Sequence, residues 1–183
     1  MLRRLQIAIV AIALAALLVP AVPAPAASDD LIVVKKRKIK SFGGFAPQGP
    51  SPNTTAAAAV FGPGVVLVET ENLCRVSYAA DGVTISFVNL GAPGYSACDP
   101  VAGKAQVMAA SAPGWRTDRG LAVGDRVKRL KKLYRERKLK GGVWELVGKK
   151  SFIGTSGHQV VLAAFVSGGQ VTGFKAFPRS AGD

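Results

Sequence analysis

Residues that could carry out acid–base or nucleophilic chemistry are few in this sequence. His158 is the only histidine, and it follows Ser156 in a Gly-rich stretch that is typical of a loop. A serine nucleophile needs a histidine base that is itself oriented by an acid, and no acid stands in a recognisable catalytic frame beside this pair. Glu69 and Glu71 alternate on an extended segment, and we interpret them as solvated carboxylates. We therefore expect a non-catalytic protein, with an enzyme built around His158 as the less favoured alternative.

Cys74 and Cys98 are the other residues with distinctive chemistry. They form no C-x-x-C pair, and two thiols supply half of a zinc site at best. An even pair in an exported chain indicates a disulfide, which here closes a loop of about 24 residues and contributes on the order of 3 kcal/mol in the chain-entropy model. The Gly-rich loops match neither a phosphate-binding nor a dinucleotide-binding motif. We expect no metal site and no cofactor.

Residues 126–140 hold nine basic side chains against Glu136 alone. At 100° per residue this segment forms an amphipathic helix, with Asp125 as the expected N-cap. The apolar side consists of Val127, Leu130, Leu133 and Tyr134, and the opposite side is a stripe of Lys128, Lys131, Lys132 and Arg135. Like-charged pairs four residues apart are unfavourable by roughly 0.2–0.5 kcal/mol each, an amount that tertiary packing can offset.

Two interpretations of this stripe stay open. The favoured one is a solvated helix face. The other is a site for a polyanion, whose binding would weaken steeply as the salt concentration rises. Aromatic residues that could stack on bases are not interleaved with the charges, so we expect no specific nucleic-acid recognition.

The first 26 residues have the pattern of a secretory signal peptide. Arg3 and Arg4 precede an unbroken apolar run of 13 residues, and a small-x-small cleavage pattern ends at Ala26. A spanning helix needs about 20 apolar residues, so we expect cleavage near Ala26 and a secreted or periplasmic chain without a transmembrane helix. The net charge of +13 favours nearby polyanions, and the expected partner is an extracytoplasmic protein or an anionic envelope polymer.

Downstream of this leader, residues 1–26, the sequence predicts three parts. These are an N-terminal strand with a Gly/Pro-rich segment (residues 27–52), a first helix-plus-meander unit (residues 53–115) and a second one (residues 116–183). In the first unit, TTAAAAVF after Asn53 predicts a short helix. The β-rich runs CRVSYA and VTISFVNL flank Asp81-Gly82, a pair favoured in two-residue hairpin turns, so Tyr78 is expected opposite Ile85. KAQVMAAS is expected to form a third strand.

The second unit repeats this order. It has the basic helix, a strand at VWELVG, and a hairpin in which QVVLAAFV and VTGFKAF flank the turn SGGQ. The recurrence at a spacing of about 70 residues indicates a duplication. The expected fold class is α+β: two helix-plus-antiparallel-meander repeats form one sheet that helices cover on one face.

Two short motifs resemble a known family. VFGPG at residues 60–64 resembles the end of the helical motif in the small outer-membrane-assembly lipoproteins of the SmpA/OmlA type, and GLAVGDRVKRLKKLY at residues 120–134 resembles its front. Two such units in tandem are similar to the β-lactamase-inhibitor-protein fold. Tyr134-Arg135-Glu136 departs from the family's Gly-x-Pro ending, and there is no lipobox cysteine. The resemblance implies a binding or assembly scaffold and transfers no functional residue.

The last hairpin is apolar on both faces, whereas one layer of helices covers only one face of a sheet. The second face, with Val160, Leu162, Val171 and Phe177, is therefore a candidate partner surface; burial within the chain is the commoner alternative. The leading hypothesis is a secreted, non-catalytic binding or scaffold module that recognises a protein partner. The alternative is an electrostatic binder of an anionic polymer or membrane surface through the basic helix, residues 126–140.

Overall fold

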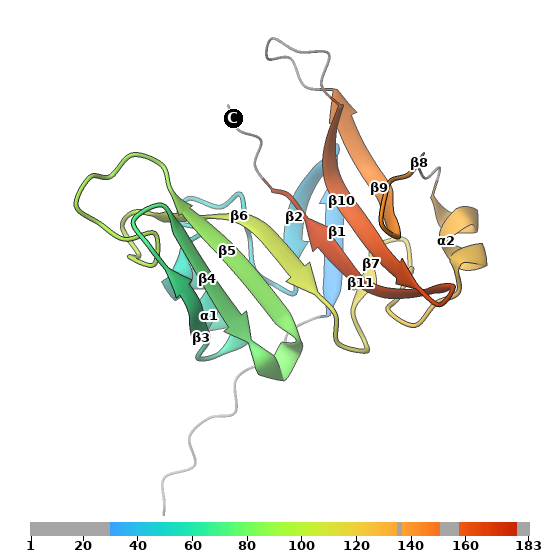
Figure 1. Ribbon diagram of the computed structural model, residues 1–183, viewed down its shortest axis with the longest axis horizontal. Helices are drawn as coiled ribbons and strands as arrows, with labels where there is room; N and C mark the ends of the chain where they lie inside the picture. The colour runs from blue at the N-terminus through green and yellow to red at the C-terminus, as the bar shows by residue number, and fades with distance from the viewer. Residues whose placement is uncertain (1–29, 135–136, 151–157, 179–183) are drawn as a thin grey trace, which may run out of the picture.

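The structure, a computed structural model, describes residues 30–134, 137–150 and 158–178. Its centre is an antiparallel sheet with the strand order β3-β4-β5-β6-β11-β10-β9-β8, and a smaller sheet has the order β2-β1-β7 (Figure 1). The predicted signal peptide lies outside the described residues, so its cleavage stays a prediction.

The large sheet has two halves. The first half comprises β3 (Val65–Glu69), β4 (Leu73–Tyr78), β5 (Val83–Asn89) and β6 (Gly103–Ala110). The second half comprises β8 (Arg137–Lys138), β9 (Val143–Lys150), β10 (His158–Ser167) and β11 (Gln170–Ala176). The halves meet where β6 pairs with β11. The small sheet comprises β1 (Leu31–Lys35), β2 (Lys38–Phe42) and β7 (Arg116–Thr117).

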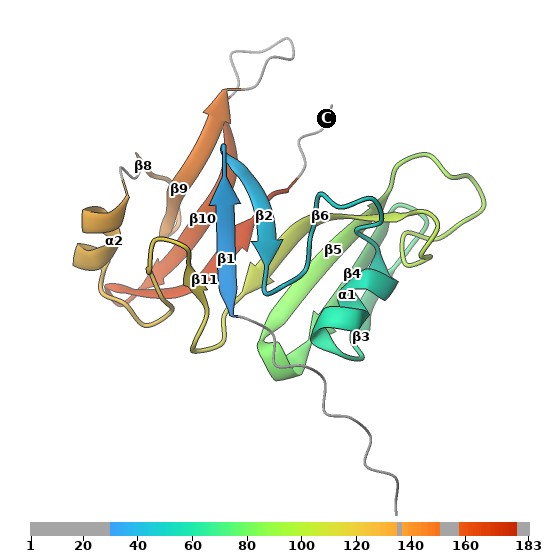
Figure 2. The ribbon, with the colours of Figure 1, turned by 180° about the vertical axis from the view of Figure 1, so that it is seen from behind.

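The fold class predicted from the sequence, α+β with helices covering one face of the sheet, is wrong. The described part of the chain is mostly β, and its two helices, α1 (Thr54–Phe61) and α2 (Val127–Leu133), have eight and seven residues. Helix α1 lies over the first half, where the ring of Phe61 is 5.4 Å from that of Tyr78. The layer over the second half is the small sheet instead, and its strand β2 contacts β10 (Figure 2).

The small sheet is hard to predict from the sequence because lysines interrupt its apolar residues. In β2, Lys40 is an extra residue at a register shift against β1. This bulge accompanies the burial of both Ile39 and Phe42, which are three residues apart and fully buried. That spacing departs from the two-residue alternation expected of a regular strand.

Trp115 ties the small sheet to the first half. Its ring centroid lies 4.7 Å from that of Phe42, and its Nε1–H donates to the carbonyl oxygen of Asp81 at 2.8 Å. A Cβ on Gly43 would lie 2.5 Å from the Trp115 ring, and Gly43 has a φ of +57°. A glycine is therefore required where the chain passes this indole.

The β4–β5 hairpin has the predicted faces but another register. Tyr78 pairs with Val83 rather than with Ile85, because the connection is a 3-10 turn at Ala79–Asp81 followed by Gly82 in the left-handed region. The two-residue connection that Asp81-Gly82 predicted is therefore wrong. Since the shift amounts to two residues, every side chain keeps its face.

Several local predictions are confirmed. Asn53 caps α1, with its Oδ1 accepting from the backbone N–H of Ala56 at 2.9 Å. Cys74 and Cys98 form the predicted disulfide, with Cα atoms 4.9 Å apart. The last hairpin turns through two residues, since Ser167 pairs with Gln170.

Helix α2 is shorter than predicted. It ends at Leu133 because the backbone of Tyr134 is extended, with φ −128° and ψ 143°. Its predicted apolar side is confirmed, since Leu130 is fully buried and its neighbours on that side pack against the core. The helix therefore contributes about two turns with basic side chains to the surface rather than a long basic stripe.

Candidate functional site

A hollow lined by several charged side chains lies between α2, β9 and the turn that joins β1 to β2. It has a volume of about 660 Å³. Four of its lining residues are cations: Arg37, Arg119, Lys131 and Lys132. The others are Leu133, Tyr134, Glu145, Leu146, Val147 and Gly148. We call this hollow the basic groove.

Helix α2 presents the two lysines of the basic groove. With Leu130 buried beneath the helix, Lys131 and Lys132 are exposed. The Nζ of Lys131 lies 5.5 Å from the centroid of the Trp144 ring, a distance at which the ring face attracts a cation. This contact orients one lysine without neutralising its charge.

Arg119 is held in a similar way. Its guanidinium lies 4.9 Å from the centroid of the Tyr134 ring, and Nη1 donates to the carbonyl oxygen of Leu133 at 3.3 Å. Both contacts are with neutral groups, so the charge of Arg119 also remains available to an anion.

Arg37 reaches the groove from a turn in an unusual conformation. The β1–β2 connection has two residues, and both Lys36 (φ 51°) and Arg37 (φ 58°) lie in the left-handed region. Such turns usually contain Asn-Gly, because residues with a Cβ are disfavoured there. Lys36 and Arg37 are the non-glycine residues with positive φ within the described ranges. Residues that keep disfavoured backbone angles often serve a site, and here one of them supplies a cation of the groove.

Tyr134 forms part of the groove wall and is buried at 3 % exposure. Burial raises the pKa of its hydroxyl, and the Asp118 carboxylate adds to this rise; the Thr117 side chain and the Arg119 guanidinium oppose it. A tyrosine hydroxyl is protonated at neutral pH even at its ordinary pKa of 10.0, and the raised pKa reinforces this. Tyr134 therefore adds no negative charge to the four cations.

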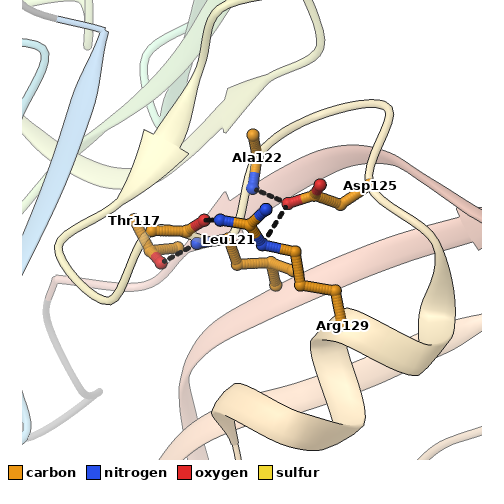
Figure 3. A network of polar contacts seen from close by, with 6 residues as sticks. Thr117, Leu121, Ala122, Asp125 and Arg129 are labelled. Carbon is orange, nitrogen blue, oxygen red and sulfur yellow. Dashed lines mark hydrogen bonds and ion pairs between the residues drawn. The ribbon is translucent and has the colours of Figure 1, made fainter.

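A polar network fixes the loop before α2 (Figure 3). Asp125 Oδ2 accepts from the backbone N–H of Ala122 at 2.7 Å and pairs with Arg129 Nε at 3.3 Å. Arg129 Nη2 also donates to the carbonyl oxygen of Gly120 at 2.9 Å. The predicted N-cap role of Asp125 is wrong, because the N-cap position falls on Arg126, which makes no side-chain cap bond. Asp125 instead fixes the loop before α2. Arg129 contacts Asp125 and Gly120 of this loop and does not line the groove.

The four residues of the predicted basic stripe do not form one site in the structure. Lys131 and Lys132 line the basic groove, whereas Lys128 is exposed but does not line it. Arg135 lies outside the described residues. Arg119 was not predicted for this site. Arg37 belongs to the basic run KKRKIK at residues 35–40, which the sequence identifies either as a solubilising edge strand or as an addition to the positive field of the helix. Sequence alone does not show that this run lies across from α2.

The predicted partner surface is not a continuous exposed face. Leu162 and Val171 are buried, at 0 % and 1 % exposure. Val160 and Phe177 are half-buried and line a separate, largely apolar hollow of about 160 Å³. The physical reason is a pair of register shifts between Val160 and Ala163, which interrupt the regular alternation of side chains along β10.

The described residues contain no candidate catalytic pair and no candidate metal site. Ser156 and the side chain of His158 lie outside them. The described ranges hold no group of three or more His, Cys, Asp or Glu residues that could bind a metal. Within the same ranges no helix is both long enough and apolar enough to cross a membrane.

No family model, curated protein or solved structure matches the chain.

Proposed function

We propose that this protein is an exported binding protein whose basic groove holds an anionic polymer of the cell envelope through its phosphate or carboxylate groups. One observation carries the proposal. Arg37, Arg119 and the pair Lys131-Lys132 are far apart in the sequence but surround one hollow. A disulfide in the first half of the sheet supports an oxidising, extracytoplasmic location.

The arrangement differs from an ordinary solvated helix face. Cations of a solvated face belong to one element, whereas those of the basic groove come from the β1–β2 turn, the loop after β7 and α2. Collecting like charges around a concave surface is unfavourable in the free protein and raises the local concentration of an anionic ligand. Among the described residues that line the groove, four are cations and Glu145 is the one carboxylate, so the charge of this described lining is positive.

This function replaces the protein-partner surface predicted on the last hairpin. Two of its four residues are buried, so they are not available to a partner. The groove binds by charge. Among its described lining residues Tyr134 is the one aromatic side chain, and its ring faces Arg119, so the described lining offers no free ring on which bases could stack. We therefore expect it to select charge density rather than sequence.

Binding of polyphosphate and of poly-L-glutamate tests the proposal and distinguishes phosphate from carboxylate ligands. Each neutralised charge on a single-stranded polyanion contributes about 0.7 to the salt dependence. Four cations therefore predict that the logarithm of the affinity falls with the logarithm of salt concentration with a slope of about −3. Removing two of them, in Lys131→Ser/Lys132→Ser, should weaken binding about tenfold, or about 1.4 kcal/mol.

A control with equal charge loss separates the groove from the overall charge. Lys128 and Lys140 are exposed and lie outside the lining of the groove. The Lys128→Ser/Lys140→Ser variant should bind about as tightly as the original protein. If both double variants weaken binding equally, the cations act as a diffuse field and the groove is not the site.

A further inference from the structure

An apolar edge strand lies at the far end of the sheet from the basic groove. Strand β3 pairs with β4 on one side, and within the described part of the chain no strand pairs with its other side. Val65, Val66 and Leu67 are 63 %, 50 % and 56 % exposed. Edge strands are usually protected from pairing with other chains by charged residues or short length. In β3 charge comes only at the end, with Glu69.

The register of β3 defines the segment that could pair. The β3–β4 register is regular at Val65 and Val66, and a shift at Leu67 follows. Beyond the shift, Glu69 is held by the Ser96 hydroxyl, which donates to its Oε1 at 2.8 Å. The accessible apolar segment is therefore short and centred on Val65 and Val66.

The charge of the chain is divided unequally between the two halves. Residues 53–115 hold four carboxylates and two cations, whereas residues 116–183 hold fifteen cations and five carboxylates. The corresponding net charges are −2 and +10. Strand β3 is the outermost strand of the half with little charge, and β8 is the outermost strand of the half with high positive charge.

We infer that β3 pairs antiparallel with β3 of a second copy of this chain to form a symmetric dimer. A two-fold axis between Val65 and Val66 places Val65 of each copy opposite Val66 of the other copy. Both of these contacts are apolar. It places Glu69 opposite Gly62 of the second copy, so no carboxylate faces another. A symmetric contact of this kind closes at two copies.

The charge distribution favours a second copy at this edge. Pairing through β3 brings together the ends with little charge and leaves the two strongly positive halves at opposite ends of the dimer. Contact through the second half would instead bring two charges of +10 together. The dimer also carries two basic grooves pointing away from the shared edge, which would let one long polyanion engage both.

The dimer should be weak and should respond to salt in the opposite direction to polyanion binding. Stable interfaces bury at least about 1,000–1,200 Å² in total, and a short edge segment offers less. Added salt screens the repulsion between positive copies and leaves the apolar contact intact. Dimerisation therefore strengthens with salt, whereas ligand binding in the groove weakens. The two proposals can thus fail independently.

Sedimentation equilibrium of the purified protein, over a wide concentration range at low and high salt, tests the inference. We expect a monomer–dimer equilibrium that shifts toward dimer at high salt. Val66→Lys places like charges in the pairing segment and should abolish the dimer at all concentrations reached. The matched control is Val101→Lys, because Val101 is 68 % exposed, lies outside β3 and undergoes the same change. It should dimerise like the original protein.

Other outcomes overturn the inference. They are a monomer at every concentration, species larger than a dimer, a dimer that weakens with salt, or equal loss of dimer in Val66→Lys and Val101→Lys. If circular dichroism shows that Val66→Lys does not fold, Val65→Lys takes its place, because Val65 is the more exposed of the two. A dimer that survives in a folded Val65→Lys protein also overturns it.

Discussion

The two halves of the large sheet have the same number of strands but opposite surface chemistry. The first half contains the disulfide, has an apolar outer strand and carries more carboxylates than cations. The second half collects most of the cations and forms the basic groove. The net charge of the whole chain hides this division, because it averages a nearly neutral end with a strongly positive one. The two proposals accordingly assign contact with a second copy to the first half and contact with anions to the second.

The halves also differ in the layer that covers them. Helix α1 packs on the first half through Phe61, whereas the small sheet packs on the second half through β2 (Figure 2). Trp115 belongs to the region of the small sheet but donates its hydrogen bond to Asp81 in the first half. The two ends are therefore joined by the central pairing of β6 with β11 and also by this indole.

The largest expected effect comes from removing that indole. Trp115→Ala should lower the free energy of unfolding by about 3–5 kcal/mol, the usual range for a buried aromatic residue. Trp115→Phe, which keeps a ring but loses the N–H donor, should lose less. Urea unfolding followed by circular dichroism measures both. If the alanine variant unfolds in two separate transitions, the halves are distinct stability units; a single transition at lower urea shows that they unfold together.

A smaller effect is expected from the β1–β2 turn, and it has opposite signs for stability and for binding. Replacing Lys36-Arg37 by Asn-Gly should stabilise the fold by about 1 kcal/mol, because two residues with a Cβ leave the left-handed region. It should also weaken polyphosphate binding a few-fold, because Arg37 is removed from the groove. Thermal unfolding and binding titrations measure the two effects.

The single change Lys36→Asn is the control for this pair. It relieves only the first turn residue and leaves Arg37 in place, so most of the affinity should remain. Unchanged polyphosphate affinity in the double variant would show that Arg37 takes no part in binding. Anion binding in the groove would then depend on Arg119 and on the lysines of α2.

The smallest effect concerns two buried tyrosines, one in each half. Burial raises the pKa of Tyr78 to about 12 and raises that of Tyr134 as well. Because the folded-state pKa of Tyr78 lies above the unfolded value of 10.0, its contribution to stability is complete below about pH 10 and is lost as the pH rises toward 12. We expect Tyr78→Phe to reduce the loss of stability between about pH 10 and about pH 12.

The corresponding change in the second half is Tyr134→Phe. It should also reduce the alkaline loss of stability, as measured by urea unfolding at each pH. If Tyr78→Phe leaves the pH dependence unchanged, then Tyr78 is not protected from ionisation in the folded protein. The packing of Phe61 on its ring would then be looser than the structure shows.

The sequence predicted best those features whose cause lies within a few neighbouring residues. Asn53 is followed by a run of alanines, and α1 begins where this pattern predicts. The two apolar faces of the β4–β5 hairpin follow from alternation, which a register shift of two residues leaves intact. The shift itself could not be predicted, because Asp81-Gly82 is compatible with both a two-residue turn and the longer 3-10 turn that the chain adopts.

Long-range features were beyond the reach of such reasoning. Arg37 and Lys131 meet at the groove because β2 contacts β10 and α2 ends at Leu133, and neither fact is encoded near either residue. The expectation that helices would cover the sheet failed for a similar reason. The apolar residues of β2 are few, and a bulge interrupts their pattern. One of them, Phe42, is buried against Trp115, which lies more than seventy residues later in the chain.

The central joint between the halves is narrow. Strands β6 and β11 share three residue pairs, from Phe174–Ala110 to Ala176–Met108, whereas the neighbouring pair β5–β6 shares seven. Within the large sheet, the backbone pairing between the two halves therefore consists of these three residue pairs. The contact of β2 with β10 and the hydrogen bond from Trp115 to Asp81 reinforce this narrow pairing, so the relative position of the halves depends on the small sheet as well as on β6 and β11.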